Sequence, residues 1–319
     1  MKVTQLGKTL IGAAALSVAA AGFALAGDLT MGTTSPTSSH FTISVAMSKA
    51  LEKGMAGTNV TVIETGASVD NVLRLMREEI DLGLATTNVL LAARNGTGKF
   101  DGHPVADTVA LYPYSTSMLL VAVRADSGVM TLNDLAGKKF TPGIRGSSAE
   151  GLISKTLDMF DIDADLVYGT VGDAVEGIKN RQLVGYGKYG AGTSVDATLR
   201  ELMTSTKMRL IGYSQEQADA VSAAVEGVGF VTIEAGMIPG SDAVLVPKSN
   251  VFFLTRVAVM DDDRAYNIAK SIHENMDILI EAWPQMKDYD IAADARGSID
   301  AGVPFHPGAV RYWKEVTGN

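Results

Sequence analysis

The chain of 319 residues contains no cysteine. This absence excludes disulfides, thiol nucleophiles, thiolate metal sites and a lipid-attachment cysteine. Histidine is scarce, and none of His40, His103, His273 and His306 has a second ligand at metal-binding spacing. The sequence also lacks a G-x-S-x-G elbow, an H-E-x-x-H pair and a G-x-x-x-x-G-K-[ST] loop. We therefore expect no enzyme activity, no bound metal and no cofactor.

The first 26 residues have the composition of an export signal. They begin with the positive charges of Lys2 and Lys8, continue with apolar and small residues, and end in a small-x-small pattern at Ala24 to Ala26. A signal peptidase accepts this pattern, so we expect cleavage after Ala26 and a periplasmic protein. The alternative is a retained membrane anchor, but the segment is weakly hydrophobic and shorter than the ~20 strongly apolar residues of a span. We expect the mature chain to be a monomer without a lipid anchor.

Basic residues are outnumbered by acidic ones, 27 to 36. Since two of the basic residues lie in the expected signal, the mature chain has 25 basic against 36 acidic residues and a net charge of −11. This balance disfavours nucleic acid and anionic membrane surfaces as partners. It also means that local dipoles must bind any anionic ligand, because the long-range field of the protein repels it.

The chain contains two junctions of the same kind. Residues 60–68 predict a strand and a Gly/Ser turn before a helix from Val69, and residues 139–148 predict the same arrangement before a helix from Ala149. A helix start leaves backbone N–H groups unpaired and carries the positive end of the helix dipole, so each junction can receive an anion without a cation. We therefore expect one anionic ligand held between two lobes.

The order of elements predicts the fold class. Each of these helices leads through a polar stretch to another strand, at Leu82–Asn88 and within Asn180–Gly190. Alternating strands and helices indicate a two-lobed α/β fold with mostly parallel sheets, helices on both faces and the ligand cleft at the hinge. Separate strands are expected at 109–112, 118–123, 242–247 and 251–259, with a helix over 263–280 and a return crossing between lobes at 227–233. The expected division is a signal at 1–26, a first domain of 27–122 plus 230–319, and a second domain of 123–229.

The serines at the two junctions have two possible roles. Ser147 and Glu150 fit a capping box, so helix capping is one role of Ser147, Ser148 and Ser68, and ligand contact is the other. The two roles are compatible, because capping uses one N–H group and a ligand can use the others. Thr86, Thr87 and Asn88 would supply hydroxyl and amide groups at the edge of the cleft, although structural turn residues would look similar.

One motif belongs to another functional class. Gly185-Tyr-Gly-Lys-Tyr-Gly190 matches the G-x-G-x-x-G pattern of dinucleotide-binding proteins. It lies in the middle of the chain, and the next expected strand, Met208–Ile211, is followed by Gly212-Tyr-Ser without an acid for a ribose. The pattern therefore does not predict a dinucleotide site.

The C-terminal segment Phe305-His-Pro-Gly-Ala-Val-Arg-Tyr-Trp-Lys-Glu315 is the most distinctive part of the sequence. This segment and four others resemble segments of the TAXI family, the extracytoplasmic solute-binding subunits of TRAP secondary transporters. The four others are Thr65–Val72, Leu120–Leu135, Gly143–Ser148 and Ile233–Gly240. The resemblance covers nearly all of the mature chain.

This resemblance implies a type II periplasmic-binding-protein fold that closes on a small organic acid, with glutamate and 2-oxoglutarate among the ligands of relatives. It implies that the closed form docks on a TRAP membrane permease, which couples uptake to a sodium gradient. It also implies ligand contacts from five segments of the chain, with these members: Ser39, His40 and Phe41; Ala67, Ser68 and Asn71; Thr86 and Thr87; Gly146, Ser147 and Ser148; Lys188, Tyr189 and Gly190.

The first loop departs from the family pattern. Relatives usually carry Gly-Gly-Thr-Tyr-Tyr there, whereas this chain has Ser38-Ser39-His40-Phe41, and Thr86 stands where relatives often have glutamine. A histidine becomes a cation near its usual pKa of ~6.5, so His40 facing the ligand would make binding pH-dependent. The alternative is a solvent-facing histidine. These changes alter pocket shape and hydrogen-bond donors, which leaves the choice of acid open.

Two other functions are compatible with the sequence. A sensor that presents the same kind of acid to a signalling receptor would need the same fold and no catalysis. A periplasmic enzyme on a two-lobed scaffold is the third possibility, and it would be recognised by turnover of candidate acids or by a metal found on purification.

Overall fold

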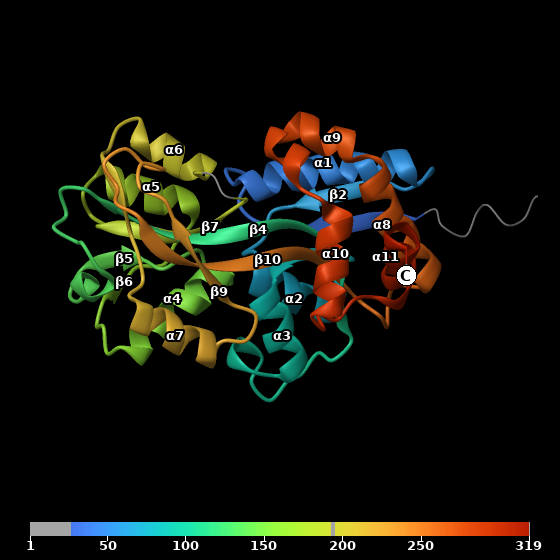
Figure 1. Ribbon diagram of the computed structural model, residues 1–319, viewed down its shortest axis with the longest axis horizontal. Helices are drawn as coiled ribbons and strands as arrows, with labels where there is room; N and C mark the ends of the chain where they lie inside the picture. Colours follow the sequence, from blue (N-terminus) through green and yellow to red (C-terminus); the bar gives the residue numbers. More distant parts are fainter. Residues whose placement is uncertain (1–26, 193–194, 319) are drawn as a thin grey trace, which may run out of the picture.

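The protein forms two lobes joined by two long strands (Figure 1). The computed structural model describes residues 27–192 and 195–318, so the expected signal peptide lies outside the described residues. Within those ranges, no helix is long and apolar enough to cross a bilayer. The two-lobed α/β arrangement confirms the predicted fold class.

The first lobe, on the right in Figure 1, is assembled from both ends of the described chain. Its parallel strands are β1 (Leu29–Gly32), β2 (Val60–Ile63) and β3 (Leu82–Thr86). Its helical segments are α1 (Ser39–Gly54), α2 (Ser68–Met76), α3 (Thr87–Asn95), η1 (Gly98–Phe100), α8 (Asp262–Glu274), α9 (Met276–Ala282), η3 (Pro284–Asp288), α10 (Ile291–Asp300) and α11 (Pro307–Thr317). One apolar core lies among these elements, with Tyr112, Phe253 and Trp313 among its largest buried side chains.

The second lobe has the same kind of layered construction. Its strands are β5 (Lys139–Thr141), β6 (Asp165–Leu166), β7 (Gly185–Gly190), β8 (Met208–Ile211) and β9 (Gly229–Ile233). Its helical segments are η2 (Leu132–Leu135), α4 (Ser148–Met159), α5 (Val171–Lys179), α6 (Ala197–Met203) and α7 (Gln215–Ala224). Two separate apolar clusters, one around Phe140 and one around Leu202, cover this lobe's part of the sheet.

The strands β4 (Thr108–Arg124) and β10 (Val244–Arg256) run antiparallel through both lobes. The sequence had predicted two strands in each place, separated at residues 113–117 and at residues 248–250. Both segments instead continue as strand, and the pairing shifts register where Phe252 lies opposite Pro113. The sheet is therefore mixed, since these two strands introduce antiparallel pairs between the parallel strands of each lobe.

The strand β9 differs from the expected return crossing. It pairs with Val244–Lys248 of β10, whereas Val251–Leu254 of β10 pairs with β3 of the first lobe. The proposed division of the chain into domains stays a prediction, and we propose from these pairings that the chain passes between lobes near Ser115–Ser117 and Ser249–Asn250. The expected helix over 263–280 is also divided, into α8 and α9 at Asn275.

Candidate functional site

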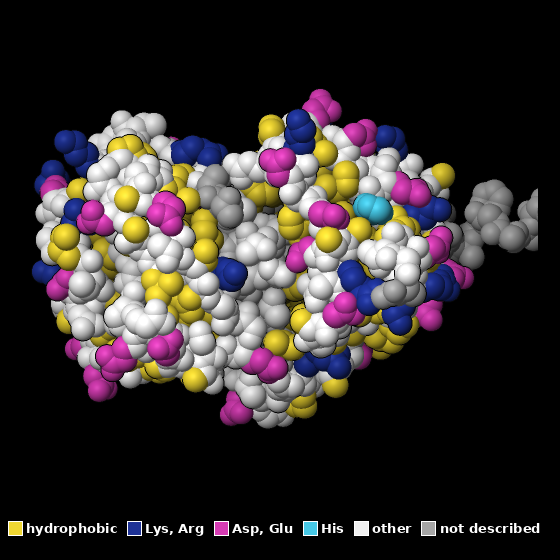
Figure 2. All heavy atoms as spheres, viewed as in Figure 1, with side chains coloured by type: hydrophobic (Ala, Val, Ile, Leu, Met, Phe, Trp, Pro, Cys, Tyr) yellow, Lys and Arg dark blue, Asp and Glu magenta, His cyan; other side chains and the backbone are white. Residues whose placement is uncertain are grey.

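A cavity of about 60 Å³ lies between the lobes. The first lobe contributes Thr34, Ser38, His40 and Ser68 to its lining, and the second lobe contributes Thr141, Ser147, Lys188 and Tyr189. On the face seen in Figure 2 the surface narrows and is hollowed between the two halves of the molecule. The described residues contain no group of acidic and histidine side chains that could hold a metal ion.

Five helices begin at this cavity. The N-cap residues of α1, α2, α3, α4 and α5 are Ser38, Ala67, Thr86, Ser147 and Thr170, and all of them line it. Helix N-termini carry partial positive charge and unpaired N–H groups. Their convergence makes the cavity favourable for an anion although the protein as a whole is acidic.

The hydroxyl groups at these N-caps fall into two sets. Ser147 accepts a hydrogen bond from the Glu150 backbone N–H at 3.1 Å, and Thr170 accepts one from Asp173 at 3.1 Å, so both cap their own helices. Ser38 and Thr86 make no such bond to their helices. The Thr86 Oγ1 atom is buried and has no hydrogen-bond partner within the described structure. A buried hydroxyl without a partner costs free energy, which a ligand oxygen or nitrogen at this position would recover.

The cation in the lining is Lys188, which already has a partner. Its Nζ lies 2.5 Å from Oδ1 of Asp196, the N-cap of α6, and donates to Ser38 Oγ at 3.2 Å. Burial lowers the pKa of Lys188, and Asp196 partly offsets this. Burial alone would raise the pKa of Asp196, but the Lys188 ammonium and the Thr198 backbone N–H hold it below its usual value. The pair therefore brings little net charge to the cavity.

His40 is buried, and its Nδ1 lies 3.0 Å from the hydroxyl of Tyr114. Burial, together with the nearby Lys188 ammonium, lowers the pKa of His40 to about 4. His40 is therefore not the solvent-facing histidine of the sequence-based alternative, and in this closed arrangement its pKa lies below the usual ~6.5. At physiological pH the imidazole is neutral and cannot supply a cation to the ligand.

The lobes touch around the cavity. The Gly146 carbonyl of the second lobe accepts hydrogen bonds from the Val69 and Asp70 backbone N–H groups of the first, at 2.8 and 3.1 Å. Ser148 Oγ donates to Asn88 Oδ1 at 3.2 Å, again between the lobes. These contacts describe a closed arrangement. They also show that the Gly146 carbonyl occupies part of the α2 N-terminus, where the sequence had suggested ligand.

Comparison with known proteins agrees with this architecture. A model described as the NMT1-like family matches residues 31–317. The chain belongs to the NMT1-like family. The narrower TAXI assignment is not distinguished by this match and stays a prediction.

Solved structures of low sequence identity share the fold of this NMT1-like protein. One, described as a periplasmic transporter, has a TM-score of 0.54 at 11% identity and covers 91% of this chain and 96% of its own. A putative L-cystine ABC transporter from Listeria monocytogenes has a TM-score of 0.53 at 12% identity, with coverages of 83% and 97%. A structure from the study of glutathione and cystine import in Streptococcus mutans has a TM-score of 0.50 at 12% identity, with coverages of 82% and 95%.

The structure of this NMT1-like protein brings one group of the predicted site residues to the cavity. Each of the five predicted segments contributes at least one of them. They are His40, Ala67, Ser68, Thr86, Ser147, Ser148, Lys188 and Tyr189. Ala67 has φ of 70°, a region that costs an L-residue free energy. Strain at a cavity wall is consistent with a functional turn.

The other predicted residues lie outside the cavity lining. Phe41 faces an outer groove against α9, and Thr87 Oγ1 donates to the Asn250 carbonyl at 3.3 Å near the crossing strands. Ser39 Oγ donates to Asp196 at 3.3 Å, and Gly146 makes the contact between lobes described above. Gly190 is a buried strand residue paired with Met118. These five residues are therefore not among those that line the cavity.

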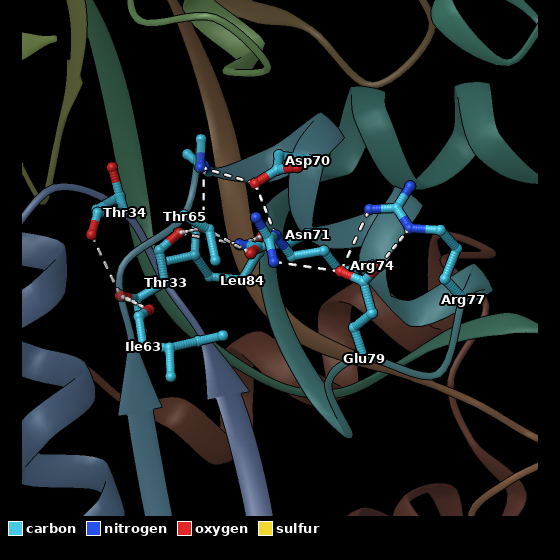
Figure 3. Close-up of polar contacts among 12 residues, drawn as sticks. Thr33, Thr34, Ile63, Thr65, Asp70, Asn71, Arg74, Arg77, Glu79 and Leu84 are labelled. Atoms are coloured by element: carbon cyan, nitrogen blue, oxygen red, sulfur yellow. Dashed lines mark hydrogen bonds and ion pairs between the residues drawn. The ribbon is translucent and has the colours of Figure 1, made fainter.

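Asn71 lies beneath the cavity and binds the backbone (Figure 3). Its Nδ2 donates to the Thr33 and Leu84 carbonyls, both at 2.9 Å, and its Oδ1 accepts from Thr65 Oγ1 at 2.7 Å. Thr65 in turn accepts from the Ala67 N–H at 3.1 Å. Asn71 therefore ties the ends of β1 and β3 to the strained turn and does not reach the ligand space.

Several lining residues were not predicted from the sequence. Leu84, Ile144, Val171 and Val251 are apolar and gave no signal distinguishable from core packing. Thr170 could have been found, because it forms a capping box with Asp173 at the start of α5. Asp196 carried no signal in the sequence, since its role depends on Lys188.

Proposed function

We propose that this protein captures a small organic acid in the cavity between its lobes, outside the cytoplasm, and releases it unaltered to a membrane transporter. The observation that carries the proposal is the convergence of five helix N-caps from both lobes on one cavity. Each lobe alone holds only some of these groups. An anion would therefore be bound best when the lobes are closed.

The proposed ligand contacts are the predicted residues that line the cavity. Backbone N–H groups at the starts of α1, α3, α4 and α5 would receive the carboxylate, and Ser68, Ser148 and Thr86 would add hydroxyl groups. Lys188 would contribute through its bond to Ser38 rather than as a free charge. Because His40 is neutral, the affinity should change little between pH 6 and 8.5, which replaces the pH dependence expected from the sequence.

A thermal-shift screen of organic acids, sugars and cations tests the binding proposal. An acid at 100 to 1,000 times its Kd should stabilise the protein by ~2.7–4.1 kcal/mol. Small-angle scattering should show a smaller radius of gyration with that acid than without it if the free protein samples an open form. Stabilisation by sugars or cations, with none by any acid, would contradict the proposal.

The TRAP-type membrane permease is the proposed partner, on the basis of the TAXI resemblance. Uptake of the identified acid into vesicles that carry the candidate permease should require this protein and a sodium gradient. Uptake that needs ATP and not sodium would assign the protein to an ABC-type importer instead.

A further inference from the structure

We infer that the cavity selects an organic acid without an ammonium group over the α-amino acid of the same carbon chain. This inference rests on the proposed function and specifies its substrate class as unsubstituted, hydroxy or keto acids. An α-amino acid carries the same carboxylates and one added positive charge. The selection therefore depends on what the cavity offers to that positive charge.

The groups that face the cavity offer positive charge. Four helices of nine or more residues, α1, α3, α4 and α5, begin at its wall. The positive ends of their dipoles attract a carboxylate and repel an ammonium group. Lys188 lines the same space, and none of the described lining residues is an aspartate or a glutamate. An ammonium group in the cavity would therefore find no carboxylate in the lining to pair with.

The carboxylate of Asp196 does not line the cavity, and it already has three donors. Its Oδ1 accepts from Lys188 Nζ at 2.5 Å and from the Thr198 N–H at 3.0 Å. Its Oδ2 accepts from Ser39 Oγ at 3.3 Å. If Asp196 turned to a ligand ammonium, it would leave the buried Lys188 ammonium without its partner, which is strongly unfavourable. Asp196 is therefore committed to Lys188 and not to the ligand.

Three other carboxylates, in the first turns of α2, α4 and α5, also bind the protein itself. None of the three lines the cavity, and each accepts from a backbone N–H group of the turn before its own helix. The pairs are Asp70 with Gly66 at 2.9 Å, Glu150 with Gly146 at 3.0 Å, and Asp173 with Thr170 at 2.8 Å. These carboxylates stabilise the turns at the cavity and are not placed to receive an ammonium group.

The remaining acceptors near the cavity are weaker partners for a cation. The N-cap carbonyl oxygens of Ser38, Ala67, Ser147 and Thr170 already accept from N–H groups of their own helices. Thr86 Oγ1 is buried without a hydrogen-bond partner in the described structure, but a hydroxyl can donate to an oxygen as well as accept from an ammonium. Charges and dipoles therefore determine the selection, because a buried cation without a carboxylate is strongly unfavourable.

Matched ligands isolate the effect of the ammonium group. Succinate, malate and aspartate share one carbon chain and differ in carrying a hydrogen, a hydroxyl or an ammonium at one carbon. Propionate, lactate and alanine form the same series on a shorter chain, and glutarate, 2-hydroxyglutarate and glutamate on a longer one. Titration calorimetry on the full mature protein should show, in each series that binds, an amino acid at least tenfold weaker than its hydroxy acid. The hydroxy acid controls for size, because it carries a neutral group at the same carbon.

The variants Thr86→Asp and Thr86→Asn test the role of charge. Both new residues suit the N-cap of α3 and are similar in size, but only the aspartate adds a carboxylate to the lining. The added charge weakens carboxylate binding for every ligand, so the ratio of two affinities is compared. The preference for the hydroxy acid over the amino acid should be at least tenfold smaller in Thr86→Asp than in Thr86→Asn.

The outcomes separate this inference from the proposed function. An amino acid that binds as tightly as its hydroxy acid, or more tightly, would overturn the inference and leave the proposed function intact. The same ratio in both Thr86 variants would overturn the assignment of the selection to charge. If no acid of any series binds, the proposed function itself fails. The wild-type series is decisive even if the Thr86 variants do not fold.

Discussion

The imidazole of His40 is neutral in the folded protein because burial and Lys188 lower its pKa to about 4, against ~6.5 in an unfolded chain. Between these values the unfolded chain binds the extra proton, so acid destabilises the fold. His40 has no effect above pH 6.5, and its contribution becomes unfavourable as the pH falls, by ~1.4 kcal/mol per pH unit towards pH 4. Urea unfolding of wild type and His40→Gln at pH 7.5, 6.0 and 5.0 should show the wild type losing stability relative to the variant as the pH falls.

In the difference between wild type and His40→Gln, the effect of the carboxylates on the free energy of unfolding cancels, because they titrate in both proteins. Asp196, which opposes the shift of His40, is present in both. A stability difference that stays constant from pH 7.5 to 5.0 would mean that His40 has an ordinary pKa in the folded protein.

The G-x-G-x-x-G pattern of this sequence has a structural origin, because it forms the strand β7. Gly185-Tyr-Gly-Lys-Tyr-Gly190 is the strand itself, between β4 and β5, and not a phosphate-binding loop. A Cβ at Gly185 would lie 2.2 Å from the Ala122 carbonyl oxygen, and one at Gly187 would lie 2.0 Å from Ile153 Cδ1. The glycines permit close packing of β4 and α4 against this strand.

Gly185→Ala should therefore lower the free energy of unfolding by ~1–3 kcal/mol or more, because backbone must move to admit the methyl group. The matched control is Gly297→Ala in α10, where no atom lies within 4 Å of the added Cβ. This variant should be neutral or more stable by up to ~1 kcal/mol, since alanine favours helix. Urea unfolding measures both, and equal stability of the two variants would contradict this account of the strand.

The closed arrangement of the whole molecule depends on close approach of the two lobes at Gly66. A Cβ at Gly66 would lie 2.5 Å from the Arg145 carbonyl oxygen of the other lobe. That carbonyl is next to Gly146, which bonds to α2. Because the clash exists only when the lobes are together, Gly66→Ala should oppose closure more than it opposes folding.

We expect Gly66→Ala to weaken ligand affinity by at least tenfold, with a ligand-saturated radius of gyration larger than that of wild type. Its unfolding free energy without ligand should fall by less than ~1 kcal/mol if the free protein opens. Gly151→Ala in α4, where the added Cβ meets nothing within 4 Å, is the control and should bind as wild type does. Wild-type affinity in Gly66→Ala would show that binding does not need this closed arrangement.

Local patterns in the sequence were sufficient for the α/β fold class and for the two strand–turn–helix junctions. Ser147 caps α4 as its position before Glu150 predicted. These features depend on residues a few positions apart, and hydrogen bonding within one turn of helix determines them. The sequence alone therefore located the starts of α2 and α4 and their serines, which lie at the cavity.

The tertiary structure decided which of the predicted residues meet, and in what state. The C-terminal segment that carried the family resemblance is structural: His306 Nε2 contacts the Met260 carbonyl at 2.9 Å, and Trp313 donates to the Leu111 carbonyl at 2.9 Å. The neutral His40 and the paired Lys188 depend on burial and on charges distant in sequence, since Ser38 and Lys188 are 150 positions apart. No local pattern encodes such a contact, because desolvation and Coulomb energies are set by the distances that folding creates.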